Sequence, residues 1–295
     1  MDKRLAFYKE FVSPDCDRMH FILQRLKENN VKAVVMPIEG RNHIYVVFSQ
    51  SSYNPMFRIK TVIAHYDRFE GSPGANDNSS SVMALIDWAC ELNKMQFHNV
   101  RLIFTDGEEL CANKDCSVSS QGAFGLASVF KRLKITQDDV YVFDCVGRGT
   151  IPVLADSVIS KKANPNFIKR FSKLKERTQN LLQASCTHFL CLPVGYSDNA
   201  GFFANGIPAV VITFLPEDEA QKYMKDLISF PELCDFVLNG KSCANCSKDF
   251  LSEKLPATWK RLHTPLDNLE SLTPESFLVM KKILFNLAQL KSLSL

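Results

Sequence analysis

The chain lacks the features that would point to a membrane or to a nucleic acid as its partner. No stretch approaches the roughly 18 to 20 consecutive apolar residues that span a bilayer. No lysine- or arginine-rich block is present, and 35 basic against 32 acidic residues leave a formal charge of only +3. We therefore expect neither a membrane nor a nucleic acid as partner.

The first residues also lack the apolar run of a secretory signal peptide, since "MDKRLAFYKEF" is charged from its start. We therefore expect a cytoplasmic protein whose ten cysteines are reduced thiols. Cys243 and Cys246 have the spacing of a zinc-binding pair, and Cys234 is nearby. No second pair accompanies them, so we expect ordinary thiols here, and likewise at Cys111 and Cys116.

Short apolar runs alternate with helical patterns along most of the chain. The predicted strands are 31–38, 43–49, 58–65, 99–105, 139–147 and 207–214. The predicted helices are 15–29, 79–95, 122–133, 165–183 and 273–290. Strands that alternate with helices predict an α/β fold with a mixed, mostly parallel central sheet and helices on both faces. A hairpin turn at 39–42 places antiparallel strands at one edge.

The whole chain, 1–295, is expected to form a single domain. With 46% hydrophobic residues it can bury a full core, and it contains neither an internal repeat nor a low-complexity linker. Residues 216–260 are the least regular stretch, with clustered charges and cysteines. We expect this stretch to form an irregular excursion over one face.

Residues suited to bind a metal follow several predicted strands. "TVIAH" ends at His65, two residues before Asp67, and "RLIFT" runs into "DGEE", residues 106–109. Asp144 follows "VYVF", and His263 lies shortly before the last helix. Ligands of open α/β sheets bind at the carboxyl ends of the strands. A carboxylate within an apolar run, such as Asp144, needs a partner or a cation.

Each of these features has a plain explanation when taken alone. Acidic residues suit helix N-termini, and Asp77 could simply cap the helix that follows it. Together, two histidines and three carboxylates could give each of two divalent ions one imidazole, one private carboxylate and one shared carboxylate. This arrangement leaves an open position on the metal for water, as is typical of a catalytic zinc site. Zinc is the favoured metal for such ligands, although cobalt or manganese could bind similarly.

The motifs that carry these residues resemble the M28 family of zinc-dependent exopeptidases, which includes aminopeptidases and the related glutaminyl cyclases. The resemblance runs through "AHYD", "GANDNSSS", "DGEE", "VFDCVG", "YSDNAGFFANGIPAV" and "HTPLDNLESL", in the order of the family, over most of residues 60–290. It implies a zinc-exopeptidase fold, a peptide or aminoacyl substrate and up to two zinc ions per chain.

The resemblance also implies a role for individual residues. Asp77 would bridge the two zinc ions, with His65 and Asp144 completing one site. Glu109 and His263 would complete the other site.

Three further implications concern the residues around the ligands. Glu108 matches the general base of the family, and Asp67 matches the carboxylate that fixes the ring orientation of the first histidine. The peptide bond between Asp77 and Asn78 is expected to be cis.

Three functions remain open at this point: an aminopeptidase, a glutaminyl cyclase with a single zinc ion, and a non-catalytic zinc-binding domain. In a cyclase, Asp77, Glu109 and His263 would hold the zinc, while Glu108 and Asp144 would transfer protons. The long segment 110–121 resembles the cyclases. Leu262 stands where cyclases carry a tryptophan before the last histidine, which favours the peptidase.

Two features bear on the substrate. In the peptidases a histidine often follows the "SD" pair, whereas here the residue is Asn199. The sequence therefore leaves open how the substrate is positioned. The presence of every ligand and of Glu108 argues against a non-catalytic domain. The apolar stretches 188–196 and 201–210 are expected to line part of the cleft and to suit an apolar side chain of the substrate.

Overall fold

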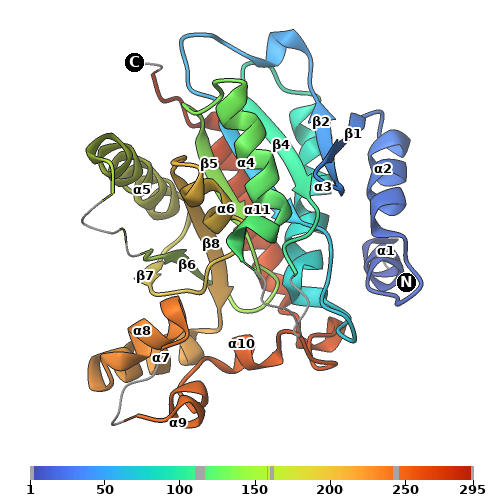
Figure 1. Ribbon diagram of the computed structural model, residues 1–295. Helices are drawn as coiled ribbons and strands as arrows, with labels where there is room; N and C mark the ends of the chain where they lie inside the picture. Colours follow the sequence, from blue (N-terminus) through green and yellow to red (C-terminus); the bar gives the residue numbers. More distant parts are fainter. Residues whose placement is uncertain (1–2, 110–116, 158, 160–162, 242–245, 294–295) are drawn as a thin grey trace.

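A mixed β-sheet forms the centre of the protein (Figure 1). The computed structural model describes residues 3–109, 117–157, 159, 163–241 and 246–293. The described residues form an eight-stranded sheet in the order β1-β2-β4-β3-β5-β8-β6-β7. The strands are β1 (Lys32–Ile38), β2 (Arg41–Val47), β3 (Lys60–His65), β4 (Val100–Thr105), β5 (Asp139–Phe143), β6 (Ile151–Ala155), β7 (Leu190–Leu192) and β8 (Ala209–Leu215).

Parallel pairing dominates the middle of this sheet and antiparallel pairing its flanks. Strand β3 is parallel to β4 and β5, and β5 is parallel to β8. The pairs β1–β2, β2–β4 and β6–β8 are antiparallel, while β6–β7 is parallel. The predicted mixed sheet with a hairpin at one edge is confirmed. The sequence did not predict β6 and β7, which are short.

Helices cover both faces of the sheet, as expected. The longer helices are α1 (Lys3–Phe11), α2 (Arg18–Glu28), α3 (Ser80–Leu92), α4 (Gly122–Arg132), α5 (Pro165–Ser185), α7 (Glu217–Ser229) and α11 (Pro274–Gln289). The shorter ones are α6 (Asn199–Ala204), α8 (Glu232–Asn239), α9 (Lys248–Glu253) and α10 (Ala257–Arg261), with single turns η1 (Gln50–Ser52), η2 (Ala75–Ser79), η3 (Val118–Ser120) and η4 (Leu269–Ser271). None of the described helices is long and apolar enough to cross a membrane.

Two cores arise because successive side chains of a strand point to opposite faces. Val62 of β3 and Leu102 of β4 pack with the core formed by α2, α3, α5 and α11. Their neighbours Ile63 and Ile103 pack with α4 and α6 on the other face. The central strands are therefore buried on both sides, and their ends are held in fixed positions.

The stretch 216–260 is largely helical, which corrects the expectation of an irregular excursion. It contains α7, α8, α9 and most of α10. Ala220 and Tyr223, three residues apart on α7, are buried in a third core with Val153 of β6 and Leu192 of β7. The charged residues around these two positions obscure the helical period in the sequence. In Figure 1 these helices form a lobe below the sheet.

Candidate metal centre

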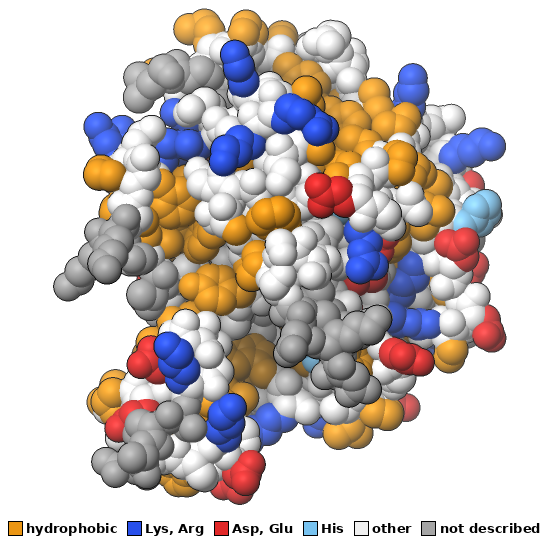
Figure 2. All heavy atoms as spheres, in the orientation of Figure 1, with side chains coloured by type: hydrophobic (Ala, Val, Ile, Leu, Met, Phe, Trp, Pro, Cys, Tyr) orange, Lys and Arg blue, Asp and Glu red, His pale blue; other side chains and the backbone are white. Residues whose placement is uncertain are grey.

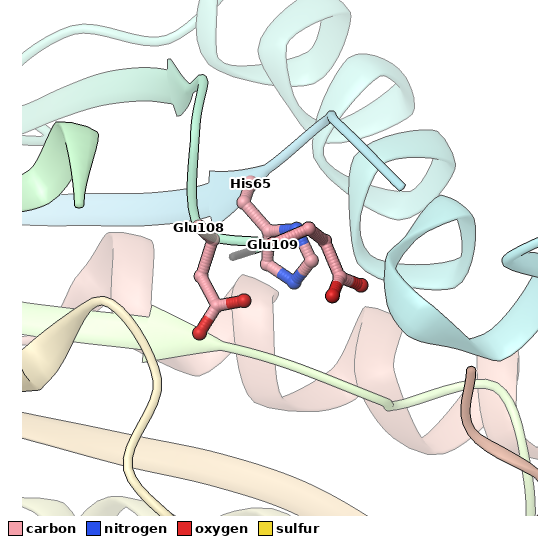
Figure 3. A group of neighbouring side chains, drawn as sticks. All are labelled: His65, Glu108 and Glu109. Carbon is pink, nitrogen blue, oxygen red and sulfur yellow. The ribbon is translucent and has the colours of Figure 1, made fainter. Parts of the chain in front are cut away.

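Three neighbouring strands bring a histidine and several carboxylates to one edge of the sheet. His65 is the last residue of β3, and Asp144 directly follows β5. Glu108 and Glu109 lie in the segment after β4. Because β3 is parallel to both β4 and β5, the carboxyl ends of the three strands meet. Figure 3 shows Glu108 and Glu109 on either side of the His65 ring.

Asp77, in η2, lies between two histidines. Its Oδ1 is 3.2 Å from Nε2 of His65, and its Oδ2 is 3.4 Å from Nε2 of His263. Asp144 places an oxygen 3.6 Å from the same His65 nitrogen, and Glu109 places one 3.1 Å from Nε2 of His263. Two groups thus share Asp77: a buried set (His65, Asp77, Asp144) and an open set (Asp77, Glu109, His263).

Both sets fit a zinc ion. Two ligand atoms bound to tetrahedral zinc at 2.0–2.2 Å lie about 3.4 Å apart, and the distances between the paired atoms here are 3.1 to 3.6 Å. Both ring nitrogens of His65 and Oε1 of Glu109 are buried without a hydrogen-bond partner. Buried polar atoms of this kind are costly unless something binds them. A cation in the buried set would satisfy Nε2 of His65, which faces Asp77 and Asp144, while Nδ1 faces Asp67. A cation in the open set would bind the Glu109 carboxylate.

The charges of the two histidines depend on the surrounding carboxylates. Although burial favours the neutral ring, the carboxylates of Asp144, Asp67 and Asp77 raise the pKa of His65 well above its usual value. Contacts with Asp77 and Glu109 raise the pKa of His263 to about 10, while partial burial lowers it. The raised pKa of each ring means that a cation binding there would compete with a proton.

Asp67 supports the centre without joining either set. Its Oδ1 lies 3.5 Å from Nδ1 of His65. The same carboxylate accepts hydrogen bonds from the backbone N–H groups of Glu108 at 3.2 Å and Glu109 at 2.9 Å. Burial alone would raise the pKa of Asp67, but His65 and these two N–H groups hold it below its usual value. The side chain therefore fixes the turn that carries both glutamates, in addition to facing the histidine.

The η2 turn is held by side chains from distant parts of the chain. Asp267 accepts hydrogen bonds from the backbone N–H groups of Asn76 at 2.8 Å and Asp77 at 3.0 Å. Asn78 donates to the carbonyl of Phe143 at 3.0 Å. The peptide bond between Asp77 and Asn78 is cis, as the resemblance implies. The sequence analysis missed Asp267 because its partners are 190 and 191 residues away.

Glu108 lies beside the buried set in a strongly acidic environment. Burial raises the pKa of Glu108 well above its usual value, the nearby Asp144, Asp198 and Glu109 raise it further, and His65 opposes them. The Gln121 amide reaches its Oε1 at 3.4 Å. A bound dication would lower this pKa and favour the carboxylate.

Asp198 is a second residue that the sequence analysis did not assign, although it lies in the quoted "YSDNAGFF". It is fully buried and accepts a hydrogen bond from Oγ1 of Thr105 at 2.5 Å. Its other oxygen has no hydrogen-bond partner. Burial raises its pKa to about 6, although His65 and Thr105 lower it. Asp198 thus adds one more acidic side chain to those around His65.

A cleft of about 270 Å³ opens beside the two sets. Its lining includes Asp77, Glu108, Asp144 and His263, and the remainder is mostly apolar: Val194, Tyr196, Val211, Phe236, Val237, Leu255, Trp259 and Leu262. Figure 2 shows hydrophobic side chains in the hollow between the helical lobe and the body.

The expected lining segments are confirmed in part. From 188–196, residues 194–196 line the cleft. The stretch 201–210 does not line it, and Phe202 is instead buried in the core with α4. A pair of phenylalanines on a short helix is therefore a core feature here.

The cysteines take no part in the metal-binding groups of the described residues. All three such groups consist of histidine and carboxylates; the third is His65 with Glu108 and Glu109. Cys243, Cys111 and Cys116 lie outside the described residues. The expectation of ordinary thiols around Cys234 therefore stays a prediction.

Comparison with known proteins gives a consistent picture. A sequence model described as peptidase family M28 matches residues 46–288. No curated protein matches the chain.

Solved structures with the same fold are similar over nearly the whole chain. A Zn-dependent exopeptidase from Parabacteroides distasonis has a TM-score of 0.63 at 15% identity, covering 97% of each chain. The glutaminyl cyclase of Porphyromonas gingivalis has a TM-score of 0.61 at 15% identity, covering 98% of this chain and 97% of the cyclase. The LapA aminopeptidase of Legionella pneumophila has a TM-score of 0.62 at 12% identity, covering 99% of this chain and 72% of LapA.

Proposed function

Because the chain belongs to peptidase family M28, we propose that it is a zinc-dependent aminopeptidase that removes N-terminal residues from peptides. The family is one of metallo-exopeptidases, so the chain is an enzyme with peptide substrates. The observation that carries the proposal is the sharing of Asp77 between the buried and the open set. A shared carboxylate keeps two ions adjacent, as in two-metal hydrolases.

In this proposal each set binds one zinc ion. His65 and Asp144 complete the site in the buried set, and Glu109 and His263 complete it in the open set. The buried Nε2 of His65, which has no hydrogen-bond partner and faces Asp77 and Asp144, supports this assignment. Asp67 fixes the turn that carries Glu109 and keeps the His65 ring in place.

The metal and the protein side chains have separate roles in the proposed reaction. Zinc, when bound, lowers the pKa of a coordinated water and polarises the scissile carbonyl. Glu108 takes the proton of the attacking water and passes it to the leaving amine. The apolar wall of the cleft receives the side chain of the N-terminal residue.

The second candidate is a glutaminyl cyclase with one zinc ion in the open set. The specific observation in its favour is Trp259 of α10, which lines the cleft and lies four residues before His263 in the sequence. An indole is therefore available near the place where cyclases carry theirs, although Leu262 stands at that position. Glu108 and Asp144 would then transfer protons during ring closure.

Glu108→Gln tests the residue assigned as the general base. The amide cannot accept the water's proton, so we expect the hydrolysis of leucyl amides to fall by roughly 10²- to 10⁴-fold. The zinc content should stay at the wild-type value because Glu108 belongs to neither set.

The control is Glu70→Gln, the same chemical change at an exposed position. It should leave turnover unchanged. Equal activity of the Glu108 variant and wild type would refute the assigned base.

A further inference from the structure

Helices α1 and α2 lie outside the residues matched by the family, which begin at 46. They nevertheless contact the segment that carries Asp67 and Asp77. Arg18, the first residue of α2, is only 6% exposed, and its guanidinium reaches into the loop 66–79. A buried charge of this kind needs several partners.

The acceptors of the Arg18 guanidinium lie in two parts of this loop, its start at 66–67 and its second half at 73–79. Nη1 donates to the carbonyls of Tyr66 at 3.0 Å and Asp67 at 3.2 Å. Nη2 donates to the carbonyl of Pro73 at 2.9 Å and to Oγ of Ser79 at 3.0 Å. One planar group therefore ties the segment that follows β3 to the turn that holds Asp77.

The surroundings leave this guanidinium little freedom. The ring of Phe11 lies 4.7 Å from its central carbon. A methyl group at Gly74 would come within 3.2 Å of its Nη2 and 2.5 Å of the Asp77 carbonyl oxygen. Ser79 also donates to the Gly74 carbonyl at 2.5 Å. The loop is thus folded closely around the arginine side chain.

A second arginine joins the same two parts of the chain in the opposite direction. Arg68, in the loop, donates to the carbonyls of Val12 and Ser13 at 3.0 Å and of Pro14 at 2.6 Å. Its acceptors lie between α1 and α2 and do not belong to the loop. Arg68 therefore attaches the N-terminal helices, whereas Arg18 shapes the loop itself.

We propose that Arg18 is a positioning residue that holds the loop 66–79, and with it Asp67 and Asp77, in the geometry that binds zinc. The inference rests on the proposed function, in which Asp77 is the shared ligand. A guanidinium is suited to this task because it has five N–H donors in a fixed plane, whereas the lysine ammonium is a compact point charge. Loss of Arg18 should loosen both parts of the loop.

The test compares Arg18→Met with Arg68→Met. Both variants remove one guanidinium that joins the same two segments, so both should lower the melting temperature of the metal-free protein. We expect the zinc affinity, measured by competition with a chromophoric chelator, to fall by roughly 10- to 100-fold in Arg18→Met, as for other residues that support ligands. In Arg68→Met it should change by less than about threefold.

Arg18→Lys and Arg18→Gln keep the test informative if the methionine variant does not fold. Lysine can reach only one part of the loop, so we expect a zinc affinity between those of wild type and the glutamine variant. Wild-type zinc affinity in folded Arg18 variants would overturn the positioning role alone. Failure of the wild-type protein to bind zinc would overturn the proposed function as well.

Discussion

The two ligand sets that share Asp77 differ in how the chain builds them. In the buried set, His65 and Asp144 stand at the ends of two adjacent buried strands, and the His65 side chain is 0% exposed. In the open set, His263 comes from a loop after α10, is 49% exposed and stacks on Phe69 at 4.6 Å. The sheet therefore fixes one set, whereas loops complete the other.

This difference has a consequence for metal binding. Side chains held by strands keep their geometry without metal, whereas a loop loses conformational freedom when it binds. We infer that the buried set binds zinc more tightly and exchanges it more slowly than the open set does. The following predictions test the contrast.

The largest effect is expected for Asp77→Asn, which changes the one ligand common to both sets. An amide carries no charge and bridges two cations poorly, so the zinc content should fall below one ion per chain. Hydrolysis should fall by more than the roughly 10- to 100-fold typical of residues that only support a ligand. Elemental analysis and leucyl-amide hydrolysis measure the two effects.

Asp218→Asn, at an exposed position on α7, is the matched control and should behave as wild type. If Asp77→Asn retains both zinc ions, Asp77 is not the shared ligand.

The next effect separates the two sets. His65→Ala should lose the zinc ion of the buried set and keep the one in the open set. His263→Ala should do the reverse, so that each variant keeps about one zinc ion per chain. His65→Ala truncates a fully buried side chain and should destabilise the metal-free protein by about 2 kcal/mol or more. His263→Ala should destabilise it less than His65→Ala does, because the ring is half exposed.

Urea unfolding of the metal-free variants measures this difference. Equal destabilisation by the two substitutions would contradict the contrast between a rigid and a loop-built set.

The smallest effect concerns pH. In the metal-free protein the pKa of His263 is raised to about 10. The protonated ring therefore makes its full contribution to stability at pH values below about 6.5, the pKa of histidine in the unfolded chain. That contribution is lost as the pH rises through 10. Burial also raises the pKa values of Glu108 and Glu109, so their contributions are lost as the pH rises from the unfolded value of about 4.3, a window that begins below pH 6.5.

We therefore expect the melting temperature of the metal-free protein to fall by a few degrees between pH 6.5 and 10. His263→Gln should make this fall smaller. Zinc-loaded protein should not show it, because zinc affinity increases as the ligands lose their protons. A metal-free melting temperature that rises with pH over this range would contradict the account.

The parts of the molecule that the sequence predicted are those with local signals. The six residues of β3 are all buried, so their apolar run was evident, and His65 marked its end. Asp144 was recognisable because it interrupts a similar run. The ligand assignments in full came from the resemblance, because no local rule pairs Asp77 with His263 across 186 positions.

The missed residues act through contacts between distant segments. Asp267 holds the backbone of Asp77, and Arg18 holds the loop before it, yet no local pattern links either residue to its distant partners. Helix α7 was missed for another reason. Its first turn carries Glu217, Asp218 and Glu219, a regular N-terminal signal, but only Ala220 and Tyr223 are buried on its inner face. Two buried positions give too weak a helical period to recognise.

The most direct test of the account is the zinc content of the purified wild-type protein, measured together with the product formed from leucyl and glutaminyl peptides. The account predicts about two zinc ions per chain and release of the N-terminal amino acid by hydrolysis. One zinc ion per chain, with pyroglutamate as the product from the glutaminyl peptide, would contradict it. That result would make Asp144 a proton-transfer group rather than a ligand.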